Sequence, residues 1–127
     1  MMPIRFNEDE FADLVEQAMA GIPSQFRPYM ENLSIEIQPR PTAHTLRTMH
    51  LDPDGLLLGV YHGVALTKRS VSAPVEWPDR IILFQRNIEA VCHSREDVIE
   101  QVRQTVLHEV GHHFGLSEDD LGDLGYG

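Results

Sequence analysis

The feature that most constrains this chain is the sequence His-Glu-Val-Gly-His at residues 108–112. Side chains four residues apart on a helix project from the same face, with Cβ atoms about 5–6 Å apart. The imidazoles of His108 and His112 can therefore reach one zinc ion, while Glu109 points to a different side and can reach a water bound to that ion. The motif predicts a helix that carries two zinc ligands and a general base.

The surrounding sequence predicts where this helix begins and ends. Ser94 and Asp97 have the spacing of a capping box, and Gly115 tolerates the left-handed conformation that ends many helices. His108 and His112 share a polar sector with nearby polar residues, which predicts that this flank of the helix faces a cleft. The adjacent apolar face, expected to pack on a sheet, comprises Val98, Ile99, Val102, Val106 and Val110.

A carboxylate beyond Gly115 can supply the third metal ligand, because a chain that stops being helical can turn back toward the metal. Spacing favours Glu118, with Asp119 and Asp120 as competitors. Alternatively, Ser117 could cap a short last helix, with Asp120 completing its capping box. That arrangement still allows Glu118 to be a ligand, since a residue in the first turn could face the zinc.

The remaining histidines and the single cysteine have simpler interpretations. His113 lies near the apolar stripe and is interpreted as a hydrogen-bonded core histidine. Cys92 is interpreted as a buried, inert thiol, and a chain with one cysteine can form no intrachain disulfide, so a reducing cytoplasm is expected. Loop or surface positions are expected for His44, His50, His62 and His93.

The first half of the chain predicts a helix followed by a strand. Asn7 and Glu10 form a capping box, and Gly21 and Pro23 end the apolar helical pattern that follows it. Residues 33–38 alternate apolar and polar, as in a half-buried strand. The apolar stripe of the helix comprises Phe11, Leu14, Val15, Ala18 and Met19.

Two more strands are expected in the middle of the chain. Residues 56–66 read as a strand or hairpin in which Gly59 and Gly63 favour a sheet edge or the close approach of another backbone. Residues 80–85 are apolar enough to be covered on both faces of a sheet. Long surface loops are predicted for residues 40–55 and 68–78.

Size and charge limit the possible classes of protein. With 127 residues, the chain is expected to form one domain, residues 1–127. Its net charge of −10, with only ten scattered Lys and Arg residues, argues against a nucleic-acid partner. No stretch approaches the roughly 20 apolar residues of a membrane span, so no membrane partner is expected.

Four motifs resemble the zincin-like metallopeptidases, a small bacterial family of the zincin superfamily. They are Phe11 to Val15; Leu57, Gly59, Tyr61 and Gly63; Pro78, Asp79 and Ile81; and His108 to Leu116. The resemblance implies a minimal zincin-like α+β fold, with a small twisted mixed β-sheet, two main helices packed on one face and the active-site helix near the C-terminus. It also implies an acidic third ligand at Glu118. The methionine turn that follows this ligand in metzincins is absent from the sequence.

The leading hypothesis is a zinc-dependent metallopeptidase that hydrolyses peptide bonds. His108, His112 and Glu118 would hold Zn²⁺, and Glu109 would take a proton from the zinc-activated water and later pass it to the leaving amine. A peptide or protein substrate could add along the Leu57–Gly63 strand by backbone pairing. Candidates for stabilising the oxyanion are Tyr61, His62, Arg69 and Tyr126.

Two other hypotheses remain open from the sequence. One is a non-proteolytic metal-binding or regulatory module that retains the zincin site, since a small chain has little room for a second substrate-binding lobe. The other is a scaffold in which the motif is accidental. The sequence predicts neither the substrate nor the oligomeric state.

Overall fold

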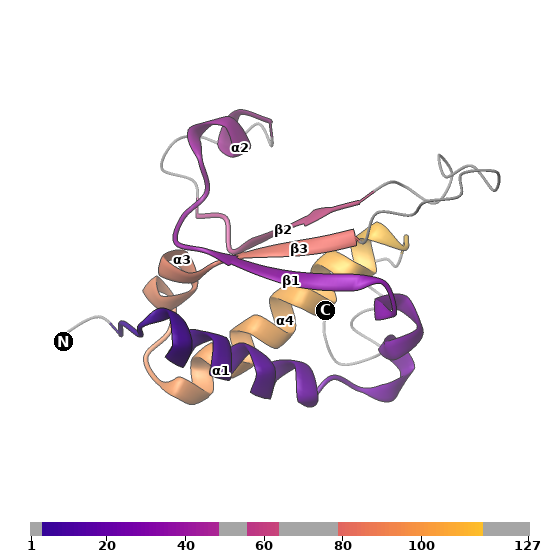
Figure 1. Ribbon diagram of the computed structural model, residues 1–127, viewed down its shortest axis with the longest axis horizontal. Helices are drawn as coiled ribbons and strands as arrows, with labels where there is room; N and C mark the ends of the chain where they lie inside the picture. Colours follow the sequence, from indigo (N-terminus) through magenta and orange to yellow (C-terminus); the bar gives the residue numbers. More distant parts are fainter. Residues whose placement is uncertain (1–3, 49–55, 64–78, 116–127) are drawn as a thin grey trace.

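A three-stranded mixed sheet carries the two long helices on one face (Figure 1). The computed structural model describes residues 4–48, 56–63 and 79–115. Strands β1 (Leu33–Gln38), β2 (Gly59–His62) and β3 (Asp79–Phe84) lie in the order β1-β3-β2. β1 runs parallel to β3 and β2 runs antiparallel to it, so β2 is an edge strand of the described sheet. The predicted α+β architecture is therefore confirmed.

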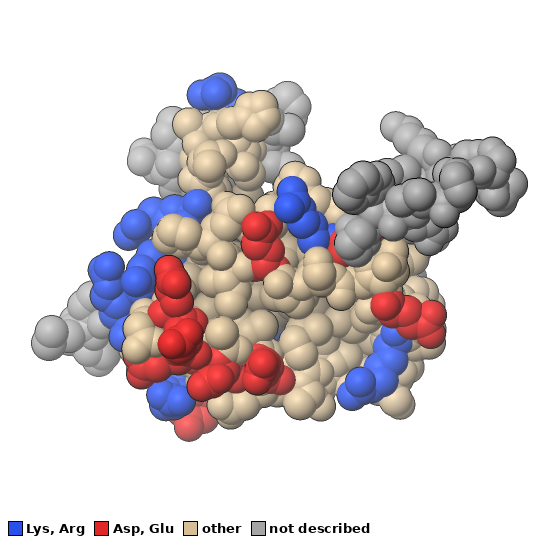
Figure 2. Space-filling view, viewed as in Figure 1, with Lys and Arg blue, Asp and Glu red and all other residues tan. Residues whose placement is uncertain are grey.

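Helix α1 (Glu8–Ala20) begins at the predicted capping box. The Asn7 side chain accepts from the Glu10 N–H at 2.8 Å, and the Glu10 carboxylate accepts from the Asn7 N–H at 3.0 Å. Acidic side chains gather over this helix in Figure 2, where the first turn alone contributes three carboxylates. They lie at the positive end of the helix dipole and are exposed, which favours a solvated helix start.

Helix α4 (Arg95–His113) also begins and ends where the sequence predicts. The Ser94 hydroxyl accepts from the Asp97 N–H at 3.1 Å, whereas the Asp97 carboxylate accepts from the His93 N–H rather than that of Ser94. The helix is followed by Gly115, whose φ of 78° is left-handed. The Gly115 N–H donates to the His112 carbonyl at 3.1 Å, which closes the last turn.

The main core lies between the helices and the sheet. α1 and α4 lie side by side, and the Arg103 Nε donates to the Ala18 carbonyl at 3.3 Å, which joins α4 to the end of α1. Ile81 and Leu83 of β3 pack into this core. The alternate residues of β3, Ile82 and Phe84, are buried with Val60 in a second cluster on the opposite face. The strand is therefore covered on both faces, as predicted.

Some boundaries differ from those predicted. Within the predicted 40–55 loop, residues Ala43–Thr48 form helix α2, because Thr42 provides a local start: its hydroxyl accepts from the Thr45 N–H at 3.1 Å. The second strand is shorter than predicted within the described residues, and the predicted loop at 68–78 lies entirely outside them. The sequence analysis also missed two elements, the 3₁₀ helix η1 (Ser24–Met30) and helix α3 (Gln85–Ala90).

Candidate active site

The site is built from two neighbouring rows of side chains on α4. Thr105, Glu109 and His113 recur every four residues and face strand β2, where they contact Gly59 and Tyr61. His108 and His112 form the adjacent row on the flank of the helix, with ring centroids 4.1 Å apart. The predicted pair of histidines thus lies together, and Glu109 is directed to a different side.

Strand β2 approaches α4 closely at Gly59. A Cβ atom at this position would lie 2.9 Å from the Thr105 Cγ2 and 3.2 Å from the Ile82 carbonyl oxygen. Both distances are shorter than an ordinary contact between heavy atoms. Glycine is therefore needed here because a helix side chain occupies the space. The edge position agrees with the prediction, whereas the nearest atom belongs to a side chain and not to the predicted backbone.

Tyr61 makes the second contact between β2 and α4. Its ring stacks on His113, with centroids 4.0 Å apart and an interplanar angle of 14°. Its hydroxyl donates to the Asp79 Oδ2 at 2.7 Å. The His113 Nε2 lies 3.8 Å from the same oxygen. Tyr61, Asp79 and His113 therefore form one cluster at the end of α4, which we call the Tyr61 cluster.

His113 has the predicted core position, but one of its ring nitrogens lacks the predicted hydrogen bond among the described residues. Its side chain is largely buried against Tyr61 and Phe114. The Nε2 is buried, and among the described residues no group forms a hydrogen bond with it. His113 belongs to the row that faces β2, so it lies apart from the row of His108 and His112.

Glu109 lies between these two contacts of β2 with α4. Burial raises the pKa of its carboxyl group, while the charges of His108 and His112 and a hydrogen bond from the backbone N–H of Tyr61 oppose that rise. A raised pKa makes the carboxylate a better proton acceptor near neutral pH. The environment of Glu109 therefore suits proton transfer.

The pairing of β2 explains why the Tyr61 N–H reaches Glu109. The Phe84 N–H donates to the Leu58 carbonyl at 3.0 Å, so Leu58, and then every second residue, directs its backbone groups toward β3. Gly59 and Tyr61 fall between them and direct their backbone groups toward the outer edge. Glu109 consequently lies at the outer edge of the sheet.

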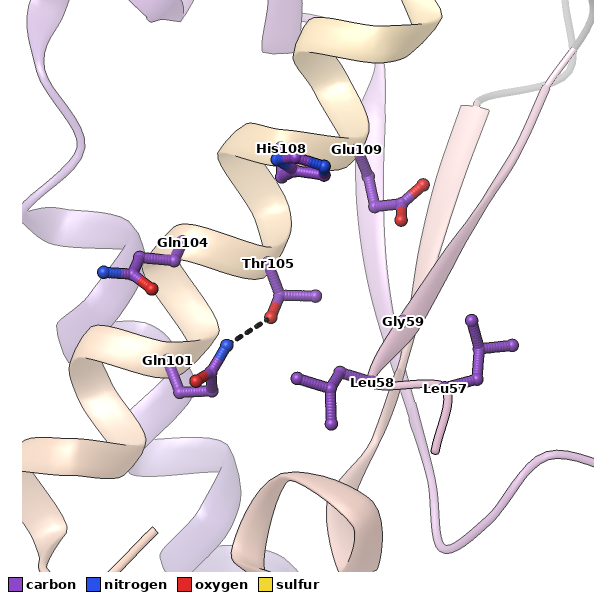
Figure 3. Close-up of a pocket in the computed structure, with 8 residues that line it drawn as sticks. All are labelled: Leu57, Leu58, Gly59, Gln101, Gln104, Thr105, His108 and Glu109. Carbon is purple, nitrogen blue, oxygen red and sulfur yellow. Dashed lines mark hydrogen bonds between the residues drawn. The ribbon is translucent and has the colours of Figure 1, made fainter. Parts of the chain in front are cut away.

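A pocket of about 290 Å³ opens beside His108 and Glu109. In Figure 3 the Glu109 side chain extends toward β2, and Leu58 lies across the pocket from Gln101, which donates to the Thr105 hydroxyl at 3.3 Å. No Lys or Arg lines this pocket among the residues the structure describes. Its lining comprises Leu57, Leu58, Gly59, Gln101, Gln104, Thr105, His108 and Glu109.

The donor set suits a zinc ion as far as it is described. His108 and His112 supply two imidazoles one helical turn apart, and imidazole nitrogen is a common zinc ligand. Glu118, Asp119 and Asp120 lie outside the described residues, and within the described ranges no cluster contains three potential ligands. The third predicted ligand therefore stays a prediction.

The other predicted positions agree with the structure where it describes them. His44, His62 and His93 are exposed, and His50 lies outside the described residues. Cys92 is 5% exposed. Burial, followed by the charges of Asp97 and Glu89, raises the pKa of its thiol to about 11, which makes it inert as predicted.

Asp79 and Gln104 also belong to this region, although neither was predicted as part of it. Asp79 was named only in the motif of Pro78, Asp79 and Ile81, yet it is 6% exposed and accepts from Tyr61. A buried carboxylate requires a partner, but no local pattern identifies that partner across 18 residues. Gln104 lines the pocket and had no signal beyond its place on the polar side of α4.

Two comparisons bear on the family of this chain. No curated protein matches it. A family profile described as "Zincin-like metallopeptidase" matches residues 30–126, well over half of the 127 residues. This family suggests a zinc-dependent peptidase that acts on peptide substrates. With a matching fold and a matching profile, the chain belongs to the zincin-like metallopeptidase family.

Proposed function

We propose that the protein is a zinc-dependent peptidase in which Glu109 is the general base. The observation that carries this proposal is the position of Glu109 beside the outward-facing N–H of Tyr61, one row away from His108 and His112. A carboxylate placed there is next to both the metal-binding row and the strand edge. This is where an extended peptide and an attacking water would meet.

Zinc would be held by His108 and His112 together with Glu118. A bound zinc ion supplies Lewis acidity, which polarises a peptide carbonyl and lowers the pKa of a bound water to about 7. The geometry of the two histidines supports this donor set. Asp119 and Asp120 are the competing third ligands.

Glu109 would move the protons of the reaction. Its carboxylate accepts a proton from the attacking water and later donates it to the leaving amine. Burial favours the protonated state, and the Tyr61 N–H holds the carboxylate in place. These two influences suit a group that must both accept and release a proton.

An extended substrate would add to the outer edge of β2. The outward-facing backbone groups of Gly59 and the outward-facing carbonyl of Tyr61 can pair with a peptide strand, which is a common mode of peptide recognition, while the Tyr61 N–H is engaged with Glu109. The adjacent pocket has walls from Leu57 and Leu58 and could take one substrate side chain. Without a lining Lys or Arg among the described residues, and with Glu109 present, it would disfavour an acidic side chain.

The geometry also narrows the candidates for oxyanion stabilisation. The Tyr61 hydroxyl donates to Asp79 and is therefore engaged elsewhere. His62 lies two residues after Val60, so the two side chains point to the same face of the sheet. Val60 packs on the face away from α4, and His62 is therefore directed away from the site. Arg69 and Tyr126 lie outside the described residues and remain the candidates.

The test is cleavage of a peptide library by the zinc-loaded protein and its Glu109→Gln variant. The proposal predicts that Glu109→Gln keeps its zinc and loses about 10²–10⁴-fold in kcat. Glu96→Gln, an exposed carboxylate on the same helix, is the matched control and should retain activity. Full activity of zinc-loaded Glu109→Gln would refute the mechanism, whereas zinc binding without any cleavage would favour the metal-binding module.

A further inference from the structure

We propose that the Tyr61 cluster is a positioning device, which fixes strand β2 against the end of α4 and thereby places the Tyr61 N–H against Glu109. The inference rests on the proposed role of Glu109 as general base. The side chains of the Tyr61 cluster do not act on the substrate themselves. Tyr61 positions Glu109 through its backbone, while Asp79 and His113 hold Tyr61.

Without such a device, few contacts would hold β2 in place. The strand has four residues and pairs only with β3 in the described sheet. Tyr61 belongs to a residue pair whose backbone groups do not point toward β3, so the ladder does not restrain its N–H directly. Its side-chain contacts must therefore set its distance from α4.

Two contacts restrain the Tyr61 ring. The hydroxyl donates to Asp79 at 2.7 Å, which fixes the far end of the ring. The ring face stacks on His113 at 4.0 Å, which fixes its distance from α4. Glu109 lies one turn before His113, so the contact that holds the ring also sets the spacing between the carboxylate and the strand.

Gly63 packs closely against two members of the cluster. A Cβ atom there would lie 2.6 Å from the Asp79 Oδ1 and 2.8 Å from the Tyr61 Cε1. The absence of a side chain at Gly63 therefore leaves room for both groups. A packed cluster of this kind cannot move one member without displacing another.

The polar groups of the Tyr61 cluster are not required for packing. A phenylalanine in place of Tyr61 could fill the same space and stack on the same imidazole. Asp79 is 6% exposed, and burying a carboxylate is costly unless it is hydrogen-bonded. Burying the hydroxyl and the carboxylate therefore costs free energy that an apolar pair would not. In return, their hydrogen bond fixes the direction of the Tyr61 ring. This favours a positioning role over simple filling of the core.

The test compares Tyr61→Phe with Tyr29→Phe as the matched control, using the full zinc-loaded chain. Tyr29 loses the same atom, but it packs on Phe114 and lies outside the Tyr61 cluster. We expect Tyr61→Phe to lower kcat about tenfold with KM changed less than about twofold, because one hydrogen bond to a charged group is lost. Hydrogen exchange of the backbone amide at position 61, measured by NMR on the metal-free protein, should be about tenfold faster, while amides in the core of α4 keep their rates.

A second pair of variants tests for rescue. Asp79→Asn keeps an oxygen that can accept from Tyr61, whereas Asp79→Ala removes it. We expect Asp79→Asn to retain more of the wild-type kcat, and slower amide exchange at position 61, than Asp79→Ala. Equal losses in both variants would contradict a role for the hydroxyl–carboxylate bond.

Two outcomes would overturn the inference. One is a Tyr61→Phe variant whose kcat and position-61 exchange equal those of Tyr29→Phe. The other is faster exchange throughout α4 and the sheet, which would make the cluster a contributor to general stability only. If zinc-loaded Glu109→Gln cleaves as well as wild type, the proposed function fails. The rate of amide exchange at position 61 in Tyr61→Phe then still decides whether the cluster holds the strand.

Discussion

Replacement of Gly59 by alanine tests the close contact between β2 and α4. The new Cβ would lie 2.9 Å from the Thr105 Cγ2, whereas carbon atoms in contact are about 3.5–4.0 Å apart, so the two must separate by about 0.6–1.1 Å. The Thr105 side chain is 8% exposed and β-branched, which restricts its rotation in the helix. On the other side, the Ile82 carbonyl oxygen at 3.2 Å limits any retreat of the strand.

The expected cost of Gly59→Ala is that of overpacking a core, about 1–3 kcal/mol. For a chain of this length this corresponds to a melting temperature lower by roughly 4–12 °C. Urea unfolding should show the loss as a lower midpoint at an unchanged slope. Since the strand and Glu109 would separate, kcat should also fall by up to about 10².

Thr105→Ser provides the matched second variant. It removes the Cγ2 that the new Cβ would meet and keeps the hydroxyl that accepts from Gln101. Alone it should cost about 0.5–1.5 kcal/mol, as for one buried methyl group. Combined with Gly59→Ala, it should relieve about 0.5–2 kcal/mol of that variant's loss. Additive losses, within about 0.5 kcal/mol, would refute the contact as the reason for glycine at this position.

Two further predictions concern the end of α4 and the buried thiol. Gly115→Ala should lower the free energy of unfolding by about 1–2 kcal/mol. The cause is the left-handed φ of 78°, since the added Cβ would meet no atom within 4 Å. Gly115→Asn should lose less in the same urea titration, because asparagine tolerates this conformation better. The Cys92 pKa of about 11 lies above the ordinary thiol value of 9.0, so the unfolded chain releases this proton first. The free energy of unfolding should therefore fall as the pH rises from about 9 to about 11, and urea titrations of Cys92→Ala should show a smaller fall over that range.

The sequence predicted those parts of the fold that depend on neighbouring residues. Asn7 and Ser94 cap the two long helices because the cap and its partner are only three residues apart. Gly115 ends α4 for an equally local reason, its left-handed conformation. The edge position of Gly59 followed from its weakness as a central strand residue.

The parts that were missed depend on contacts between distant residues or on weak local signals. Helix α3 begins directly after β3 without a side-chain cap, so no capping residue marked its start. The bond between Tyr61 and Asp79 joins two strands, and no periodic pattern identifies which row of α4 faces them. The sequence therefore predicted that Glu109 points to a different side of the helix from the two histidines. It did not predict that the Tyr61 backbone lies beside Glu109.

The central claim is that His108 and His112 bind zinc while Glu109, in a different row of the helix, does not. Zinc per chain, measured by elemental analysis after dialysis, tests it most directly. The account predicts about one zinc in wild type and in Glu109→Gln, and a large loss in both His108→Ala and His112→Ala. Equal zinc in all four proteins, or loss of zinc in Glu109→Gln alone, would contradict it.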